Sequence, residues 1–165
     1  MTPVLLPAFL ALDRGGIGLS ACPGRQAPLA RDIDAIAAEG VAMVVSLIEA
    51  TEAPETIHDL PGLLDRRGIR WRHFPIEDYG VPRDSDWPAL AGVLHRVLDE
   101  GGRILLHCWG GKGRSGMIAL RLMVERGETF SAAFERLRAL RPGAVETDAQ
   151  RAWAEAGHRT RQAIA

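Results

Sequence analysis

The chain has 165 residues, of which 47% are hydrophobic and 25% are charged, and its net charge is −1. These values are ordinary for a globular protein with a substantial core, and the charge gives no indication of nucleic-acid or membrane binding. Two cysteines without a repeated spacing exclude a disulfide framework and a cysteine zinc site, so we expect free thiols in a reducing, cytoplasmic setting.

Apolar strands alternate with helical patterns along the chain. The apolar residues 4–12 follow no basic segment and are interrupted by Pro7, which favours a first strand over a signal peptide; no run is long enough for a transmembrane helix. Short apolar runs predict further strands at 17–21, 41–48, 69–74 and 103–107. Apolar residues at helical spacing predict helices at 29–39, 57–67, 87–99, 115–126, 129–140 and 147–161. The alternation predicts an α/β fold, a three-layer single domain over residues 1–165 whose central, mostly parallel sheet is flanked by helices.

The most informative segment is residues 107–116, His-Cys-Trp-Gly-Gly-Lys-Gly-Arg-Ser-Gly. It connects a strand to a helix, so Cys108 lies at the positive end of a helix dipole. Arg114 adds a cation whose planar fork binds two phosphate oxygens. Backbone N–H groups can converge on one anion because the turn is rich in glycine: Gly110, Gly111, Gly113 and Gly116.

A nest of N–H groups beside a cation also stabilises a thiolate. We therefore hypothesise that Cys108 attacks the phosphorus of a phosphate monoester, while the loop and Arg114 stabilise the equatorial oxygens of the transition state. Ser115 has two candidate roles, as a hydrogen-bond donor to the sulfur and as the helix N-cap. His107 either orients the loop through hydrogen bonds or is a satisfied histidine at a strand end.

These residues resemble the His-Cys-x₅-Arg-Ser/Thr signature of the cysteine-dependent protein tyrosine phosphatase superfamily. The resemblance implies the fold of that superfamily, a phosphocysteine intermediate on Cys108, and no metal or other cofactor. It also implies that phosphate is bound by Arg114 and by the loop backbone of Trp109, Gly110, Gly111, Lys112 and Gly113. A nucleotide P-loop is excluded because that motif needs Ser or Thr after its lysine, where this chain has glycine.

Expulsion of an alkoxide or phenoxide requires a general acid, and hydrolysis of a phosphoenzyme requires a base. The polar residues 75–86 follow a predicted strand and carry four carboxylates: Glu77, Asp78, Asp84 and Asp86. Asp86 is well placed to cap the next helix. The superfamily places its acid a few residues after a strand-end proline, and Pro75-x-x-Asp78 matches that pattern. The resemblance therefore favours Asp78, with Glu77 and Asp84 as the remaining candidates.

Three further stretches extend the resemblance to the kinase-associated (cyclin-dependent kinase inhibitor-associated) branch of the dual-specificity phosphatases. They are residues 22–25, residues 74–78, and residues 140–145 followed by Gln150. The resemblance implies that Gln150 positions the hydrolytic water, and the alternative is an ordinary glutamine on a helix surface. Cys22 is either a buried thiol or a residue that forms a disulfide with Cys108 under oxidation.

The chain has no long aromatic-bearing insertion of the kind found in tyrosine-selective members. The resemblance thus implies a shallow cleft, open to phosphotyrosine, phosphoserine or phosphothreonine in a protein, with Trp109 and Tyr79 as candidates to flank its entrance. Lys112 lies where lipid phosphatases of the superfamily also carry lysine, so a phosphoinositide or another small polyanion is the alternative substrate. Those enzymes usually have a basic residue at the position of Trp109, which weakens that alternative.

An alternative of another class is a phospho-residue-binding module without catalysis. Such a module would lose the nucleophile or the acid, whereas this chain keeps both Cys108 and Asp78. We expect an enzyme that acts on phosphorylated proteins, does not bind nucleic acid, and is a monomer.

Overall fold

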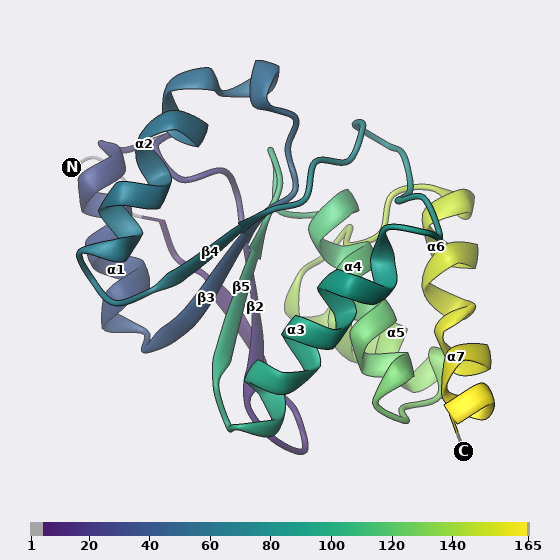
Figure 1. Cartoon of the computed structure of the whole chain (residues 1–165). Helices are drawn as coiled ribbons and strands as arrows, with labels where there is room; N and C mark the ends of the chain where they lie inside the picture. Colours follow the sequence, from purple (N-terminus) through teal and green to yellow (C-terminus); the bar gives the residue numbers. More distant parts are fainter. Residues whose placement is uncertain (1–4, 165) are drawn as a thin grey trace.

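A five-stranded sheet forms the centre of the molecule in the computed structural model, which describes residues 5–164 (Figure 1). Its strand order is β1-β2-β5-β3-β4. The strands are β1 (Ala8–Ala11), β2 (Gly16–Ser20), β3 (Val41–Ser46), β4 (Arg70–His73) and β5 (Arg103–His107). Only the β1–β2 pair is antiparallel among these strands, so the prediction of a mostly parallel sheet is confirmed.

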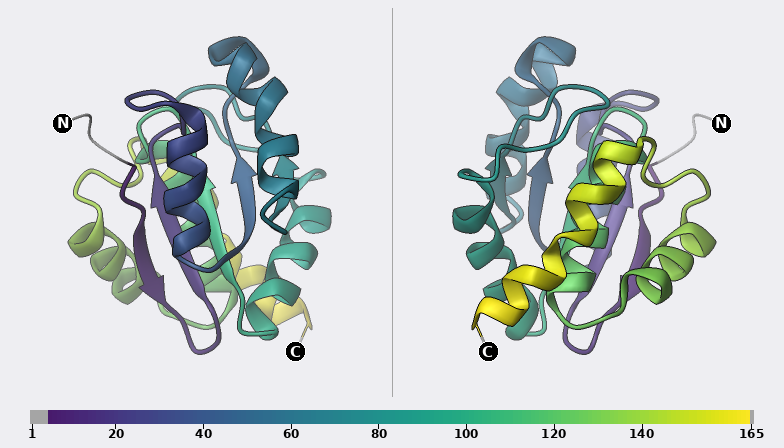
Figure 2. Two further views of the ribbon diagram at one scale, coloured as in Figure 1. Left: turned by 90° about the vertical axis from the view of Figure 1, so that its left-hand side faces the viewer. Right: turned by 90° about the vertical axis from the view of Figure 1, so that its right-hand side faces the viewer.

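Helices cover both faces of the sheet, as the predicted three-layer arrangement requires (Figures 1 and 2). One face carries α1 (Leu29–Ala38) and α2 (Pro54–Asp65), with the short 3₁₀ helix η1 (Ala50–Glu52) before α2. The other face carries α3 (Trp87–Asp99), α4 (Gly113–Glu125), α5 (Phe130–Leu140), α6 (Asp148–Glu155) and α7 (Gly157–Ile164). No helix in residues 5–164 is both long enough and apolar enough to cross a bilayer.

The continuous apolar runs of the central strands are explained by burial on both faces. Neighbouring side chains in a strand point to opposite faces of the sheet. Val44 and Leu105 accordingly pack with α1 and α2, whereas Val45 and Leu106 belong to the larger core around α4. Strands that are covered on both sides need no polar alternation, which is why their sequence reads as an unbroken hydrophobic run.

The carboxyl ends of β3, β4 and β5 meet at one edge of the sheet. In the register, Ser46 pairs with both His73 and His107, which are the last residues of their strands. Three loops therefore leave the same edge: one leads to η1, one is the polar segment 75–86, and one connects β5 to α4. Open α/β sheets bind ligands at this kind of edge.

Most element boundaries lie within two residues of the sequence prediction, and three elements differ by more. The helix predicted at 147–161 is two helices, α6 and α7, that are separated at Ala156. Gly157 lies against α4, where a Cβ atom would approach Arg121 Cδ to 2.9 Å. Helix α2 begins earlier than predicted because Pro54 is favourable in a first helical turn. The first strand is shorter than predicted, and its expected first residue, Val4, lies outside the described residues.

Candidate active site

Residues 108–114 connect β5 to α4 and form what we call the phosphate loop. Arg141 binds two carbonyl groups of this loop and keeps them turned outward. Arg141 Nη2 donates to the backbone oxygen of Gly110 at 2.8 Å, and its Nε donates to that of Gly111 at 3.0 Å. Both carbonyl dipoles therefore face the arginine, so their negative ends do not face the centre of the loop.

Two further carbonyl groups of the phosphate loop accept bonds from outside it. The oxygen of Trp109 accepts the backbone N–H of Cys22 at 3.1 Å, and that of Lys112 accepts the backbone N–H of Val145 at 3.1 Å. Within the part of the chain that the structure describes, none of the backbone N–H groups of residues 109–114 donates a hydrogen bond. The loop thus keeps a set of free N–H donors at the N-terminus of α4, which is the arrangement of an anion-binding site.

Gly111 makes this loop conformation possible. Its φ of +71° lies in the left-handed region, and a Cβ atom there would lie 2.4 Å from the backbone carbon of Ser20. Any other residue would combine backbone strain with a clash against β2. The glycine content of the segment is therefore a requirement of the fold at this position.

Cys108 lies at the floor of the loop, with its side chain almost fully buried. Its Sγ is 3.4 Å from Ser115 Oγ. Helix α4 begins at Gly113 with Lys112 as its N-cap residue, so Ser115 lies inside the first turn. The prediction of Ser115 as the N-cap is wrong, and its hydroxyl group faces the sulfur instead.

His107 is buried and bonded at both ring nitrogens. Its Nε2 is 2.6 Å from Ser46 Oγ, which also accepts the indole N–H of Trp71 at 2.9 Å. Its Nδ1 is 3.4 Å from the carbonyl oxygen of Cys108, so this nitrogen carries the hydrogen and Ser46 donates to Nε2. Burial lowers the pKa of His107 to about 4. A neutral imidazole with both nitrogens occupied matches the orienting role.

Arg114 is held by Glu52, a residue that the sequence analysis did not identify. Arg114 Nη1 and Nη2 donate to the two carboxylate oxygens of Glu52 at 2.7 and 2.8 Å, and Nη1 also donates to the carbonyl oxygen of Ile76 at 3.0 Å. Burial would lower the pKa of Arg114, but the Glu52 contact together with the nearby Cys108 and Asp78 outweighs burial, and the pKa is raised. The same ion pair is the main cause of the lowered pKa of Glu52.

The position of Glu52 follows from the topology. It lies in η1, directly after β3, and β3 is the neighbour of β5. Carboxyl ends of neighbouring parallel strands meet at one edge, so an acidic residue after β3 faces the loop after β5. This rule, applied to the loop at 49–54, is the signal that could have found it.

The contacts of Arg114 leave two donors that suit a phosphate. A guanidinium has five N–H groups, and Glu52 and Ile76 take three of them. The remaining two are Nε–H and the second hydrogen of Nη2. The Nη2 nitrogen lies 3.4 Å from Asp78 Oδ1. Two neighbouring donors on one planar group can bind two oxygens of a phosphate.

Among the four carboxylates of residues 75–86, here called the acid loop, the structure brings Asp78 to Arg114. Glu77 is exposed, and Asp84 lines a different cavity. Asp86 is the N-cap residue of α3, as predicted. Its side chain makes no capping bond, however, and its carboxylate accepts Arg83 Nε at 2.9 Å instead.

Gln150 and Cys22 are both buried. Gln150 bonds to backbone groups of the acid loop and of the segment before α6, so it is not a helix-surface glutamine. Cys22 is a free thiol, as is Cys108. Burial, with a smaller contribution from Cys108, raises the pKa of Cys22 to about 12, which keeps it protonated and unreactive at neutral pH.

The acid loop and the phosphate loop, which together form the rim of the site, carry exposed apolar side chains. Tyr79 is 60% exposed, Val81 40% and Trp109 40%. The guanidinium of Arg25 stacks over the Trp109 indole, 4.7 Å from its centre. Lys112, the only lysine of the chain, is exposed at the rim. A cavity of about 620 Å³ beside this rim is lined by Trp109, Arg25 and Glu52, among others.

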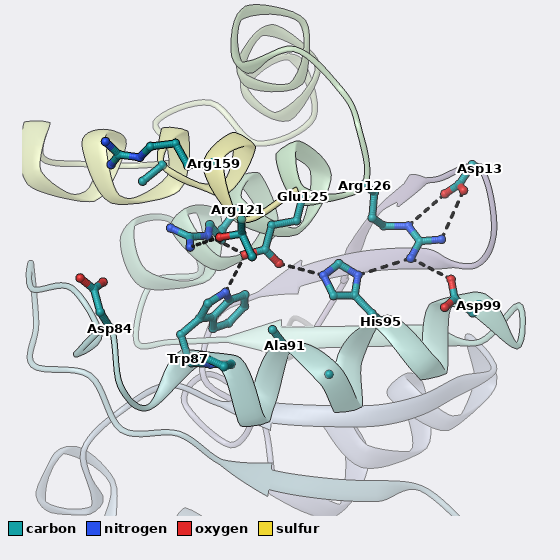
Figure 3. Close-up of a pocket in the computed structure, with 14 residues that line it drawn as sticks. Asp13, Asp84, Trp87, Ala91, His95, Asp99, Arg121, Glu125, Arg126 and Arg159 are labelled. Carbon is teal, nitrogen blue, oxygen red and sulfur yellow. Dashed lines mark hydrogen bonds and ion pairs between the residues drawn. The ribbon is translucent and has the colours of Figure 1, made fainter. Parts of the chain in front are cut away.

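A larger cavity of about 780 Å³ lies away from the phosphate loop, between α3, α4 and α7 (Figure 3). Its most buried acid is Glu125, which accepts hydrogen bonds from Trp87 Nε1 at 2.8 Å, His95 Nε2 at 2.8 Å and Arg121 Nε at 2.7 Å. Burial raises the pKa of Glu125, but these three donors together outweigh it and the pKa is lowered. The network ties α3 to α4.

Comparison with known proteins agrees with this geometry. A model of the family described as "Swiss Army Knife protein, DSP-PTPase phosphatase domain" matches residues 21–153. Cyclin-dependent kinase inhibitor 3 of Sus scrofa is 30% identical over 161 residues, which cover 88% of this chain and 74% of that protein.

Solved structures show the same fold. The kinase-associated phosphatase with its catalytic-site cysteine replaced by serine has a TM-score of 0.86 at 24% identity, covering 99% of both chains. Tk-PTP in its active form has a TM-score of 0.75 at 28% identity, covering 93% of this chain and 96% of that one. PTPMT1 in complex with PI(5)P has a TM-score of 0.73 at 16% identity, covering 90% and 93%. The chain belongs to the dual-specificity class of the cysteine-dependent protein tyrosine phosphatase superfamily and is a protein phosphatase of that class, similar to the kinase-associated phosphatase.

Proposed function

We propose that the chain hydrolyses phosphate monoesters in two steps through a phosphocysteine on Cys108. In the first step Cys108 Sγ forms a bond to phosphorus, the bond from phosphorus to the leaving oxygen breaks, and Asp78 gives that oxygen a proton. In the second step a water molecule attacks phosphorus and gives its proton to Asp78, while the bond to sulfur breaks. Ser115 Oγ, 3.4 Å from Sγ, donates a hydrogen bond to the departing thiolate.

The observation that carries this proposal is the convergence of Cys108, Arg114 and Asp78 on the free N–H donors of the phosphate loop. These donors and Arg114 stabilise the charge that develops on the equatorial oxygens. Removal of one such donor typically lowers kcat by about 10²–10³-fold. A carboxylic acid beside the leaving oxygen typically contributes a further factor of about 10²–10⁴.

We propose phosphorylated proteins as the substrates, with phosphotyrosine and also phosphoserine or phosphothreonine as reactive residues. The exposed apolar rim of Tyr79, Val81 and Trp109 suits the side chains that flank a phosphorylated residue in a polypeptide. The likeness to cyclin-dependent kinase inhibitor 3 supports the same class.

A phosphoinositide or another small polyanion is the second candidate, favoured by the exposed Lys112 and by the fold shared with PTPMT1. Binding of a polyanion weakens steeply as salt rises. Lys112→Met would then cost a lipid substrate far more than a phosphopeptide. Equal effects of salt and of this variant on the two substrates would argue for the protein substrate.

The proposal is tested by comparing wild type with Cys108→Ser on para-nitrophenyl phosphate in the presence of a metal chelator. We expect turnover by the wild type and none by the variant. The same variant should retain phosphoproteins from a lysate, because it keeps Arg114 and the loop donors. Equal rates for the two proteins would exclude the thiolate mechanism, and binding without turnover by the wild type would favour a phospho-residue-binding module.

The setting of the enzyme is proposed on the same chemistry. A catalytic thiolate is inactivated by oxidation, so a reducing, cytoplasmic location suits Cys108. We propose that the chain acts as a monomer that requires no metal or other cofactor and has no role in nucleic-acid binding.

A further inference from the structure

Gln150 bridges two segments that lie on either side of the candidate site. Its side chain is fully buried in the first turn of α6. Its Oε1 accepts the backbone N–H groups of Glu146 at 2.9 Å and Thr147 at 3.3 Å, and its Nε2 donates to the carbonyl oxygen of Gly80 at 3.2 Å. The amide group is thus anchored at the start of α6 by its oxygen and reaches the acid loop with its nitrogen.

Gly80 closes the turn that carries Asp78. The backbone N–H of Gly80 donates to the carbonyl oxygen of Glu77 at 2.8 Å, so residues 77–80 form a tight turn. Within this turn Tyr79 has a φ of +62°. A non-glycine residue in the left-handed region persists only where the surrounding structure holds it there.

Asp78 itself has few contacts that could fix its position. Its side chain is 57% exposed; its Oδ1 accepts the backbone N–H of Tyr79 at 3.0 Å, within the same turn, and lies 3.4 Å from Arg114 Nη2. Its placement therefore depends on the backbone on either side. Before the turn, Ile76 is held by its carbonyl bond to Arg114 and by its N–H bond to Leu47. At the end of the turn, the Gln150 side chain donates to the carbonyl oxygen of Gly80.

We propose that Gln150 is a positioning residue that holds the acid loop in place through Gly80, so that Asp78 faces the leaving oxygen. The inference rests on the proposed acid role of Asp78. This task differs from positioning the hydrolytic water: the amide oxygen of Gln150 accepts two backbone N–H groups, and one of the two amide N–H groups donates to Gly80.

Gln150→Glu separates the two functions of the side chain. An ionised glutamate at this position of a capping box still accepts the N–H groups at the start of α6, but it has no hydrogen to donate to Gly80. Thr147→Val is the matched control: Thr147 Oγ1 accepts the backbone N–H of Gln150 at 3.1 Å, so this change weakens the same helix start and leaves the bond to Gly80.

The measurement is kcat for aryl phosphates with good and poor leaving groups, para-nitrophenyl phosphate and phenyl phosphate. General-acid catalysis matters most for the poor leaving group. We expect Gln150→Glu to lower kcat for phenyl phosphate about tenfold more than for para-nitrophenyl phosphate, a fraction of the full acid contribution. Thr147→Val should show no such difference. Asp78→Asn/Gln150→Glu should be no slower than Asp78→Asn, since Gln150 acts through Asp78.

Three results would overturn the inference. Equal losses on the two substrates in Gln150→Glu would indicate a merely structural role, and a further loss in the double variant would show that Gln150 acts independently of Asp78. If Asp78→Asn itself shows no dependence on the leaving group, the acid role in the proposed function fails and the role of Gln150 fails with it. If Asp78→Asn shows that dependence and Gln150→Glu does not, only the inference about Gln150 fails.

Discussion

Replacement of Glu52 by glutamine should weaken both phosphate turnover and folding. Glu52 binds the buried Arg114 guanidinium with two hydrogen bonds of 2.7 and 2.8 Å. Glutamine keeps one acceptor but loses the charge and introduces N–H groups that face other N–H groups. Removing one partner of a buried ion pair costs about 3–5 kcal/mol. The side chain of Glu52 is 22% exposed, and one bond survives, so we expect about 2 kcal/mol.

The consequence for catalysis is an Arg114 side chain that is no longer oriented. A loss of about 2 kcal/mol in transition-state binding corresponds to about 30-fold in kcat/KM. We would measure kcat/KM on para-nitrophenyl phosphate for Glu52→Gln, with Glu55→Gln as a control, since Glu55 is exposed in the first turn of α2. The control should differ from wild type by less than about twofold.

Folding provides a second measurement on the same variant. Without a bound anion, the Glu52→Gln variant buries the Arg114 cation with no negatively charged partner at position 52. The urea midpoint of the variant should therefore fall. Saturating vanadate should raise both midpoints but widen the gap between wild type and the variant, because the variant binds an anion of this kind more weakly. An unchanged or raised kcat/KM would refute the reasoning, as would a stability gap that vanadate closes.

Three further results are expected. The pKa of His107 is lowered to about 4 from its ordinary 6.5, so the unfolded chain takes up a proton first as the pH falls below 6.5. Urea denaturation should therefore show a free energy of unfolding about 2 kcal/mol lower at pH 5 than at pH 7.5 from this group. His107→Asn should flatten this pH dependence. Iodoacetamide at pH 7 should label one cysteine, and mass spectrometry should place the label on Cys108 rather than on Cys22, whose pKa is raised to about 12. If Cys22 in the Cys108→Ser variant is labelled as fast as the wild-type protein, this expectation is contradicted. Glu125→Leu should lower the free energy of unfolding by about 3 kcal/mol or more, because it leaves Arg121 without its buried acid; a loss below about 1 kcal/mol would show that the network contributes little.

Much of the fold could be predicted because local patterns and tertiary packing agree. The strand at 103–107 and the helix at 87–99 have the predicted bounds, since apolar runs that are buried on both faces, and a proline in the first helical turn, are strong local signals. The break between α6 and α7 was missed, although Gly157 directly follows the C-cap residue Ala156, a position at which glycine commonly ends a helix.

The candidate site divides in the same way. Cys108, Arg114 and Ser115 were predicted from one contiguous segment, and Asp78 was selected among four acids mainly through a resemblance. Glu52 and Arg141 were missed because they contact the phosphate loop from distant parts of the chain, and the sequence alone does not show which loop they reach. Asp86 was correctly predicted as the N-cap residue of α3, but the sequence does not show that its carboxylate binds Arg83 in place of the helix backbone.

The central claim is that phosphate passes through Cys108. Wild type and Asp78→Asn, mixed rapidly with para-nitrophenyl phosphate and quenched in acid, should yield a Cys108-containing peptide that is heavier by one phosphoryl group. The adduct should decay more slowly in Asp78→Asn, because that variant lacks the base for the second step. Turnover by the wild type with no phosphoryl adduct on Cys108 in either protein, or with the adduct on another residue, would contradict the account.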